Sequence, residues 1–249
     1  MKVLLAGDLN GPDLGANFHM IMPKLAHGFA RAGHAVQAFN DRQAARYATP
    51  LHSRKLGRRR ANAQLLTLCR NFQPDLLLLG HCETIANDTL AAAREAVPGL
   101  RIAYRNVDPL PDYAHDNYQR IAQRTDVVDR VFVTTAGDKL RQFAGNRARV
   151  HFMPNPIDPS VETLRQFDAP AERLPVDLFF GFMGRAKPGD AQGEQDPRVA
   201  IASELKRRLP DAAFDLRGLD QSPVRGQRYF EAIARARMGL NFSRFSDHY

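Results

Sequence analysis

Short apolar runs alternate with longer amphipathic segments along the first half of the chain. The short runs cover residues 2–6, 35–39 and 75–79, and the longer segments cover residues 18–32 and 61–71. In the first long segment the apolar side chains recur at helical spacing, and they are Phe18, Ile21, Met22, Leu25 and Phe29. This spacing predicts an amphipathic helix, with Pro23 in its first turns, where a missing N–H costs least. The whole order predicts a βαβαβ unit.

Two of the short runs, at 76–79 and 131–133, are continuously apolar rather than alternating. Continuous runs are typical of parallel strands that helices cover on both faces. The alternation then goes on as far as residue 153. We expect helices at 85–96 and 117–124, strands at 101–107, 130–134 and 149–153, and a further segment at 138–144. These elements predict a doubly wound α/β domain.

A proline-rich boundary follows this domain, with turn-forming residues at 154–159 and 168–175. The rhythm then restarts, with strands at 176–183, 213–216 and 238–242 and helices at 199–209 and 229–236. About three strands are fewer than the five or six of a full doubly wound sheet, so we expect the second domain to be incomplete in this sequence. The predicted organisation is a domain at 1–158, a linker at 159–175 and a partial domain at 176–249.

The composition is that of an ordinary globular protein, with 44% hydrophobic and 25% charged residues. The first apolar run is too short for a signal peptide, and no run approaches the roughly 20 apolar residues of a membrane-spanning helix. Cys69 and Cys82 have no paired or metal-ligand spacing, which argues against a disulfide framework or a zinc site. We therefore expect a cytoplasmic protein.

Basic residues exceed acidic ones, and the formal net charge is +8. A dense basic run contains Arg54, Lys55, Arg58, Arg59 and Arg60. Its partner could be a nucleotide diphosphate, an anionic lipid headgroup or a nucleic acid, and the run could equally be a solvated loop without a partner. A nucleic-acid-binding module needs aromatic side chains for base stacking, and near this run only Tyr47 qualifies.

Five motifs occur in an order that resembles a known family. The first comprises the opening strand with its glycine loop and the helix end at residues 25–34. The others lie at the strand 74–79, at the Met-Pro-Asn-Pro-Ile-Asp segment 153–158, at the Phe-Met-Gly-Arg segment 182–185 and at residues 235–243. Together they resemble the group 1 glycosyltransferases of GT-B fold, in particular the spore-maturation-like branch. The resemblance implies two Rossmann-like domains, the first holding an acceptor and the second a nucleotide sugar.

This resemblance also implies a reaction. A sugar would move from a nucleotide-diphosphate donor to a glycan, a lipid-linked acceptor or a cell-envelope acceptor, with retention of configuration. No cofactor is expected, and no metal is expected either, because the sequence lacks an acidic pair in a metal-binding context. The basic run could place the protein peripherally at an anionic membrane. The alternatives are the nucleic-acid-binding module and a non-catalytic binder of nucleotides or sugars.

Candidate catalytic residues follow two predicted strands. His81 and Glu83 come directly after the strand 75–79, and Asp108 follows the strand 101–107. By resemblance a histidine here contacts the reacting sugar, and a carboxylate can orient or deprotonate an acceptor hydroxyl. In the ordinary interpretation, His81 caps the next helix and Asp108 forms a turn between prolines.

The resemblance also indicates where the substrates bind. For the donor and its diphosphate it implies Gly184, Arg185, Lys187, Ser243 and Arg244, although Lys187 follows Arg185 more closely than the family's spacing. Arginine suits this role because its guanidinium can hold phosphate oxygens in a bidentate manner. The loop after the first strand carries Gly11 and Gly15 but no GxGxxG fingerprint. These glycines, with His19 just inside the first helix, are the candidates for an acceptor loop.

Overall fold

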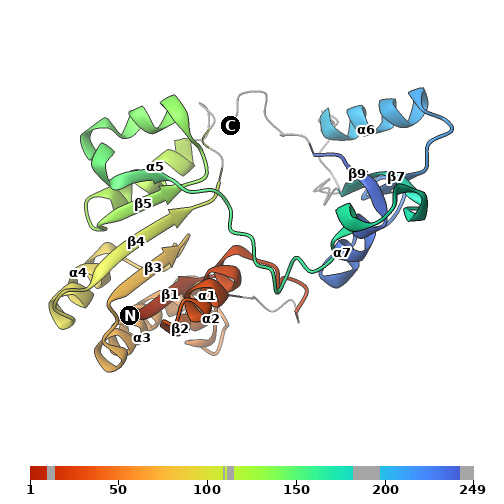
Figure 1. Ribbon diagram of the computed structural model, residues 1–249. Helices are drawn as coiled ribbons and strands as arrows, with labels where there is room; N and C mark the ends of the chain where they lie inside the picture. Colours follow the sequence, from red (N-terminus) through yellow and green to blue (C-terminus); the bar gives the residue numbers. More distant parts are fainter. Residues whose placement is uncertain (10–14, 109, 111–114, 182–196, 242–249) are drawn as a thin grey trace. The chain divides into compact units, whose positions relative to one another are not determined.

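The computed structural model describes residues 1–9, 15–108, 110, 115–181 and 197–241. Contacts between residues divide the chain near Asp158 into two compact units. Each unit contains its own parallel β-sheet (Figure 1). The predicted α/β class, with a second sheet smaller than the first, is confirmed.

The first unit is built on a six-stranded sheet in the order β2-β1-β3-β4-β5-β6, and all its strands are parallel. The strands are β1 (Lys2–Gly7), β2 (Ala35–Phe39), β3 (Leu76–Gly80), β4 (Arg101–Asn106), β5 (Arg130–Val133) and β6 (Val150–Phe152). Parallel neighbours need crossover connections, and helices supply most of them. They are α1 (Ile21–Arg31), α2 (Asp41–Tyr47), α3 (Arg54–Phe72), α4 (Asn87–Ala96) and α5 (His115–Thr125), with a 3-10 helix η1 (Gly137–Arg149) before β6.

Helices cover this sheet on both faces, as the continuous apolar runs predict. Leu77 and Leu79 point into the larger core, against residues of α3, α4 and α5. Leu78 points the other way, into a smaller core that includes Met22 and Leu25 of α1. Because successive side chains of a strand alternate between faces, a strand buried on both faces must be apolar at every position. The first unit is therefore doubly wound.

The first helix begins later than expected. Residues 15–19 form turns and α1 starts only at Ile21, so His19 lies before the helix and not inside it. Pro23 gives the physical reason, because a proline is tolerated in the first turn of a helix but removes a hydrogen bond further in. A helix that began at residue 18 would have placed Pro23 beyond that turn.

The basic run forms the first two turns of a helix. It is therefore not the solvated loop that was one of the two interpretations of its sequence. Helix α3 starts at Arg54, seven residues before the predicted start at residue 61. The Ser53 hydroxyl accepts a hydrogen bond from the amide of Leu56, which is a favourable N-cap. Arginine, lysine and leucine are good helix formers, and they carry the helix through the run. The short helix α2 was not predicted at all.

The second unit has a three-stranded parallel sheet in the order β8-β7-β9. Its strands are β7 (Val176–Gly181), β8 (Phe214–Arg217) and β9 (Ala236–Gly239), its helices are α6 (Pro197–Arg208) and α7 (Gln227–Ala234), and two 3-10 turns precede β7, η2 (Gln166–Asp168) and η3 (Ala171–Arg173). Its elements follow the predicted order, with ends that differ by a few residues. In the part of the chain that the structure describes, no helix is long and apolar enough to cross a membrane.

Candidate functional site

The carboxyl ends of β1, β3 and β4 meet at one edge of the six-stranded sheet. Gly7, Gly80 and Arg105 lie in register across these three strands. From β1 the chain crosses to β2 on one side, and later strands extend the sheet on the other side of β1. Open α/β sheets bind ligands at such a switch point, beside the carboxyl ends of the strands. This edge is therefore the candidate site of the first unit.

The strands β1 and β3 approach closely where they end. A Cβ atom added to Gly7 would lie 2.5 Å from the carbonyl oxygen of Gly80, and Gly7 has a φ of +153°. Both features require glycine at this position. The segments that follow β1 and β3 can therefore leave the sheet side by side.

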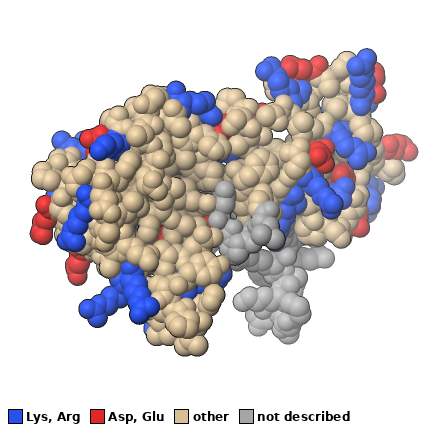
Figure 2. All heavy atoms as spheres, turned by 90° about the horizontal axis from the view of Figure 1, so that it is seen from below, with Lys and Arg blue, Asp and Glu red and all other residues tan. Residues whose placement is uncertain are grey.

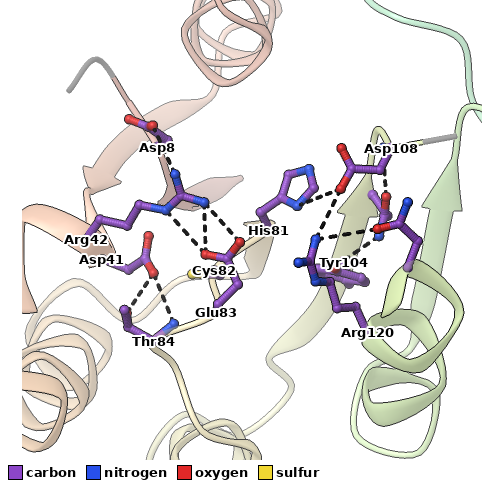
Figure 3. Close-up of polar contacts among 12 residues, drawn as sticks. Asp8, Asp41, Arg42, His81, Cys82, Glu83, Thr84, Tyr104, Asp108 and Arg120 are labelled. Carbon is purple, nitrogen blue, oxygen red and sulfur yellow. Dashed lines mark hydrogen bonds and ion pairs between the residues drawn. The ribbon is translucent and has the colours of Figure 1, made fainter. Parts of the chain in front are cut away.

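The chain bends sharply directly after β3. His81 and Cys82 have φ angles of 56° and 41°, in the left-handed region that residues with a Cβ rarely adopt. The amide of Cys82 donates a hydrogen bond to the Gly80 carbonyl at 2.7 Å, and the Cys82 side chain is buried. Strain of about 1–3 kcal/mol per residue persists only where the surroundings hold it, and it is concentrated at functional sites. The bend turns the ring of His81 toward the loop after β4 (Figure 3).

Asp108 in that loop faces His81. Its Oδ2 atom lies 3.8 Å from Nδ1 of His81 and 3.3 Å from Nη1 of Arg120, which belongs to α5. The amide of Asp108 donates a 2.8 Å hydrogen bond to the side chain of Asn106, which fixes the carboxylate at the end of β4. A carboxylate beside an imidazole can orient the ring and stabilise its protonated form. The structure thus brings two of the three predicted catalytic residues together.

The third, Glu83, is engaged by Arg42 of α2. Both carboxylate oxygens accept hydrogen bonds from Arg42 Nη2 at 2.9 Å, and Nη1 of Arg42 lies 3.6 Å from Asp8 after β1 (Figure 3). Burial alone would raise the pKa of Glu83, but the hydrogen bonds and charge of Arg42 outweigh it and lower that pKa. Glu83 is therefore a carboxylate tied to a neighbouring helix.

A buried aspartate of α2 also holds the bend after β3. Asp41, at the start of α2, is fully buried and accepts a 2.6 Å hydrogen bond from the hydroxyl of Thr84. Burial raises the pKa of Asp41, although its hydrogen bonds from Thr84 act in the opposite direction. The residues after β3 are thus held to α2 at two points, through Glu83 and Thr84.

A cleft of about 360 Å³ opens beside these residues. Its polar lining includes His81 and Glu83 from the bend, Arg58 from α3, Asn87 from α4, and Arg120 and Arg124 from α5. The volume falls within the range of small-molecule sites, about 300–1,000 Å³. The cleft is more basic than acidic.

Sequence reasoning missed three of the arginines at this site, Arg42, Arg120 and Arg124, whereas Arg58 belongs to the basic run that it did identify. Arg120 and Arg124 are four residues apart on α5, so they lie on one face of the helix. That spacing was visible in the sequence, but a pair of helical arginines is also common on solvent-exposed faces. The sequence did not indicate Arg42 as a site residue, because the helix α2 that carries it was not predicted.

The remaining predicted site residues are less informative. His19 lies in the turn before α1, where its ring contacts Phe18 edge to face at 5.6 Å. Gly15 has a φ of +88° and is exposed. The predicted residues Gly11, Gly184, Arg185, Lys187, Ser243 and Arg244 lie outside the described residues. Among the residues that are described, no group of three or more His, Cys, Asp or Glu side chains could hold a metal ion.

Comparison with known proteins gives distant likenesses only. No protein-family model matches the chain, and no curated protein matches it significantly. Among solved structures, a UDP-GlcNAc 2-epimerase from Neisseria meningitidis is 13% identical with a TM-score of 0.46, and the match covers 86% of this chain and 65% of the epimerase. This chain thus spans about two thirds of that protein's length.

Two further structures match at a similar level. Alr3699/HepE of Anabaena, in complex with UDP, is 12% identical with a TM-score of 0.39, over 97% of this chain and 70% of that one. A trehalose-6-phosphate synthase is 14% identical with a TM-score of 0.45, over 94% and 67%. Likenesses this weak carry no argument about activity, so any function must be argued from the residues of this chain.

Proposed function

We propose that this protein transfers a sugar from a nucleotide-diphosphate donor to a glycan, lipid-linked or cell-envelope acceptor. In this proposal the acceptor binds at the carboxyl edge of the first unit's sheet. The observation that carries the proposal is the pair of His81 and Asp108, 3.8 Å apart beside a strained bend at the switch point. An imidazole oriented by a carboxylate can exchange a hydrogen bond or a proton with a sugar hydroxyl. The fold alone would not support this, because α/β folds host many activities.

Glu83 is assigned a positioning role in this proposal. A carboxylate with a lowered pKa is a weak proton acceptor, and both its oxygens are already engaged by Arg42. Its bond to α2 instead fixes the bend from which His81 projects. The proton chemistry therefore falls to His81 and Asp108.

The donor is assigned to the second unit. Arg185 would hold the diphosphate as a fork, and its charge would stabilise the nucleotide as it leaves. The other residues proposed for donor binding are Gly184, Lys187, Ser243 and Arg244. Retention of configuration, with no metal and no cofactor, is part of the same proposal.

A transfer assay with site variants tests this function. The full chain is incubated with labelled UDP-sugars and GDP-sugars and a cell-envelope fraction of glycans and lipids, and label transfer and nucleotide release are measured. We expect His81→Asn and Asp108→Asn each to lower transfer about 100-fold, because proton transfer by a positioned side chain typically contributes a factor of this order or more. Asparagine is suited to the positive φ at residue 81, so the variant should keep the bend.

A histidine away from the site provides the control. His34 lies directly before β2, where its ring packs near Phe29, and His34→Asn should leave transfer unchanged. Transfer by His81→Asn at the wild-type rate, in a variant with an unchanged melting temperature, would contradict the proposal. So would the absence of transfer with every donor when thermal shift shows no nucleotide binding.

A further inference from the structure

The cleft at the carboxyl edge holds more positive charge than its carboxylates balance. Its lining contains three guanidinium groups, on Arg58, Arg120 and Arg124, against one carboxylate, Glu83. Glu83 is paired with Arg42, and Asp108 is paired with Arg120. Among the described residues, no carboxylate lies within ion-pair distance of Arg58 or Arg124. Two guanidinium groups of the described cleft lining therefore have no carboxylate at ion-pair distance, although the more distant Asp41 also favours the charge on Arg124.

Arg124 is the more unusual of the two, because it is buried. Only 8% of the residue is exposed, and its guanidinium donates to three neutral oxygens, on Asn87, Cys82 and Ile85, at 2.5–3.0 Å. Burial lowers the pKa of Arg124, which reflects how poorly this environment solvates its charge. A neutral amide could donate to the same oxygens without this penalty. An anion from outside the chain would therefore be a favourable partner for this charge.

Arg58 stands at the exposed rim of the same cleft. Its Nε atom donates to the carbonyl of Thr84 at 3.1 Å, which leaves the four N–H groups of its terminal nitrogens for another acceptor. It lies in the second turn of α3.

The amino end of α4 adds to this field. Ala86 and Asn87 line the cleft, and Ala86 caps the helix without a side-chain hydrogen bond. The first amides of a helix and its dipole favour an anion. Guanidinium groups and a helix amino end thus act on the same space from α3, α5 and α4.

We propose that this cleft binds an anionic oxygen group of the acceptor, a carboxylate or a phosphate, through Arg58 and Arg124. The acceptor would then be an acidic sugar, such as a uronic acid or a sugar phosphate, with its reacting hydroxyl toward His81. This inference deepens the proposed function. It rests on that function in one respect, because the bound sugar is the acceptor only if the protein is a sugar transferase. The binding of the anion can be measured without any transfer.

The test measures binding of acidic and neutral sugars to the full chain without a nucleotide donor. Glucuronate, glucose 6-phosphate, glucose and inorganic phosphate are titrated by calorimetry at low salt. We expect at least one of the two acidic sugars to bind more tightly than glucose and than inorganic phosphate. The acid that binds identifies the anionic group as carboxylate or phosphate.

Two arginine variants on one helix complete the test. Arg58→Gln should weaken acidic-sugar binding about tenfold or more, as expected for the loss of one charged hydrogen bond. Arg70→Gln, an equal charge change at the far end of α3, should leave binding unchanged. Equal binding of glucose and the acidic sugars, or equal losses in the two variants, would overturn the inference.

The anion site and the transferase function can fail separately. If acidic sugars bind through Arg58 but no nucleotide sugar supports transfer, the site stands and the proposed function fails. If transfer proceeds to a neutral acceptor and Arg58→Gln does not slow it, the function stands and the anion site fails.

Discussion

At the scale of single residues, the site depends on a carboxyl group placed where carboxyl groups are costly. Asp41 is fully buried, its Oδ2 atom is bound to Thr84, and its other oxygen has no partner among the described residues. Asp41 is buried because its carboxyl group binds Thr84 and so holds the bend after β3 against α2. Its cost should be visible in the pH dependence of stability.

The raised pKa of Asp41 fixes the sign of this dependence. Between the ordinary value of 3.8 and the raised value in the folded protein, the folded state binds more protons than the unfolded state, so the free energy of unfolding falls as pH rises through this window. Asp41→Asn keeps an acceptor for Thr84 but cannot ionise. We expect the wild type to lose stability relative to Asp41→Asn between pH 4 and the raised pKa, measured by urea unfolding at steps of pH. If the difference in unfolding free energy between the wild type and Asp41→Asn stayed constant with pH, or changed in favour of the wild type as pH rises, the pKa of Asp41 would not be raised by burial.

The residues of the site differ in how far the sequence could reveal them. His81, Glu83 and Asp108 could be named as candidates because they follow apolar strands, and the carboxyl ends of parallel strands meet at one edge. Arg42 and Asp41 were not identified as site residues, because their contacts join segments about 40 residues apart. Pairing across elements depends on packing, which a pattern of hydrophobic positions does not contain.

At the scale of elements, the contact between α2 and α3 joins two parts of the site, because α3 carries Arg58 of the cleft lining and α2 carries Arg42, which binds Glu83. Gly57 makes this contact possible, since a Cβ atom there would lie 1.7 Å from the carbonyl oxygen of Ala45. Gly28 in α1 offers a matched comparison, because a Cβ atom at that position would meet nothing within 4 Å. The two glycines should therefore respond in opposite ways to the same substitution.

We expect Gly57→Ala to lower the free energy of unfolding by about 1–3 kcal/mol, since α2 and α3 must move apart to admit the methyl group. Gly28→Ala should raise it by about 0.5–1 kcal/mol, because alanine favours the helix and restricts the unfolded chain. Urea unfolding of the two variants measures both effects. If Gly57→Ala were as stable as the wild type, the close packing of α2 on α3 would be wrong.

The order of elements was more predictable than their ends. The strands of the first unit were located by continuous apolar runs, which follow directly from burial on both faces of the sheet. The start of α3 was missed because its first turns carry charge rather than an apolar stripe, and there the Ser53 cap decides where the helix begins. The helix α2, only seven residues long, is too short for helical periodicity to be detected.

At the scale of the whole molecule, separate core clusters account for two units, with two clusters in each unit. The core clusters of the first unit draw only on residues up to Met153, and those of the second only on residues from Val176 onward. The intervening residues 154–175 carry the prolines that indicated a linker. A proline-rich boundary is encoded locally in the sequence, whereas the contacts that bring the candidate site residues together depend on packing.

The formal net charge of the chain is +8. On the face shown in Figure 2, Lys and Arg side chains form several separate groups. The exposed cations of Arg54, Lys55 and Arg59 nevertheless share the first turns of α3. Because α3 runs antiparallel to the strands it connects, these residues lie toward the carboxyl edge, on the side of the cleft. A membrane contact there would bring the cleft near lipid-linked acceptors.

Binding to anionic vesicles tests this contact against net charge alone. Each basic residue near an anionic surface contributes about 1 kcal/mol, so changing Arg54, Lys55 and Arg59 together to serine should weaken binding to phosphatidylglycerol vesicles about 100-fold at low salt. The control changes Arg70, Arg101 and Arg130 to serine, which removes the same charge from exposed positions at the amino edge of the sheet. A much smaller loss in this control, with both effects reduced at high salt as screening requires, is the expected result of a sedimentation assay. Equal losses in the two triple variants would mean that the vesicles respond to total charge, and the membrane contact through α3 would then be wrong.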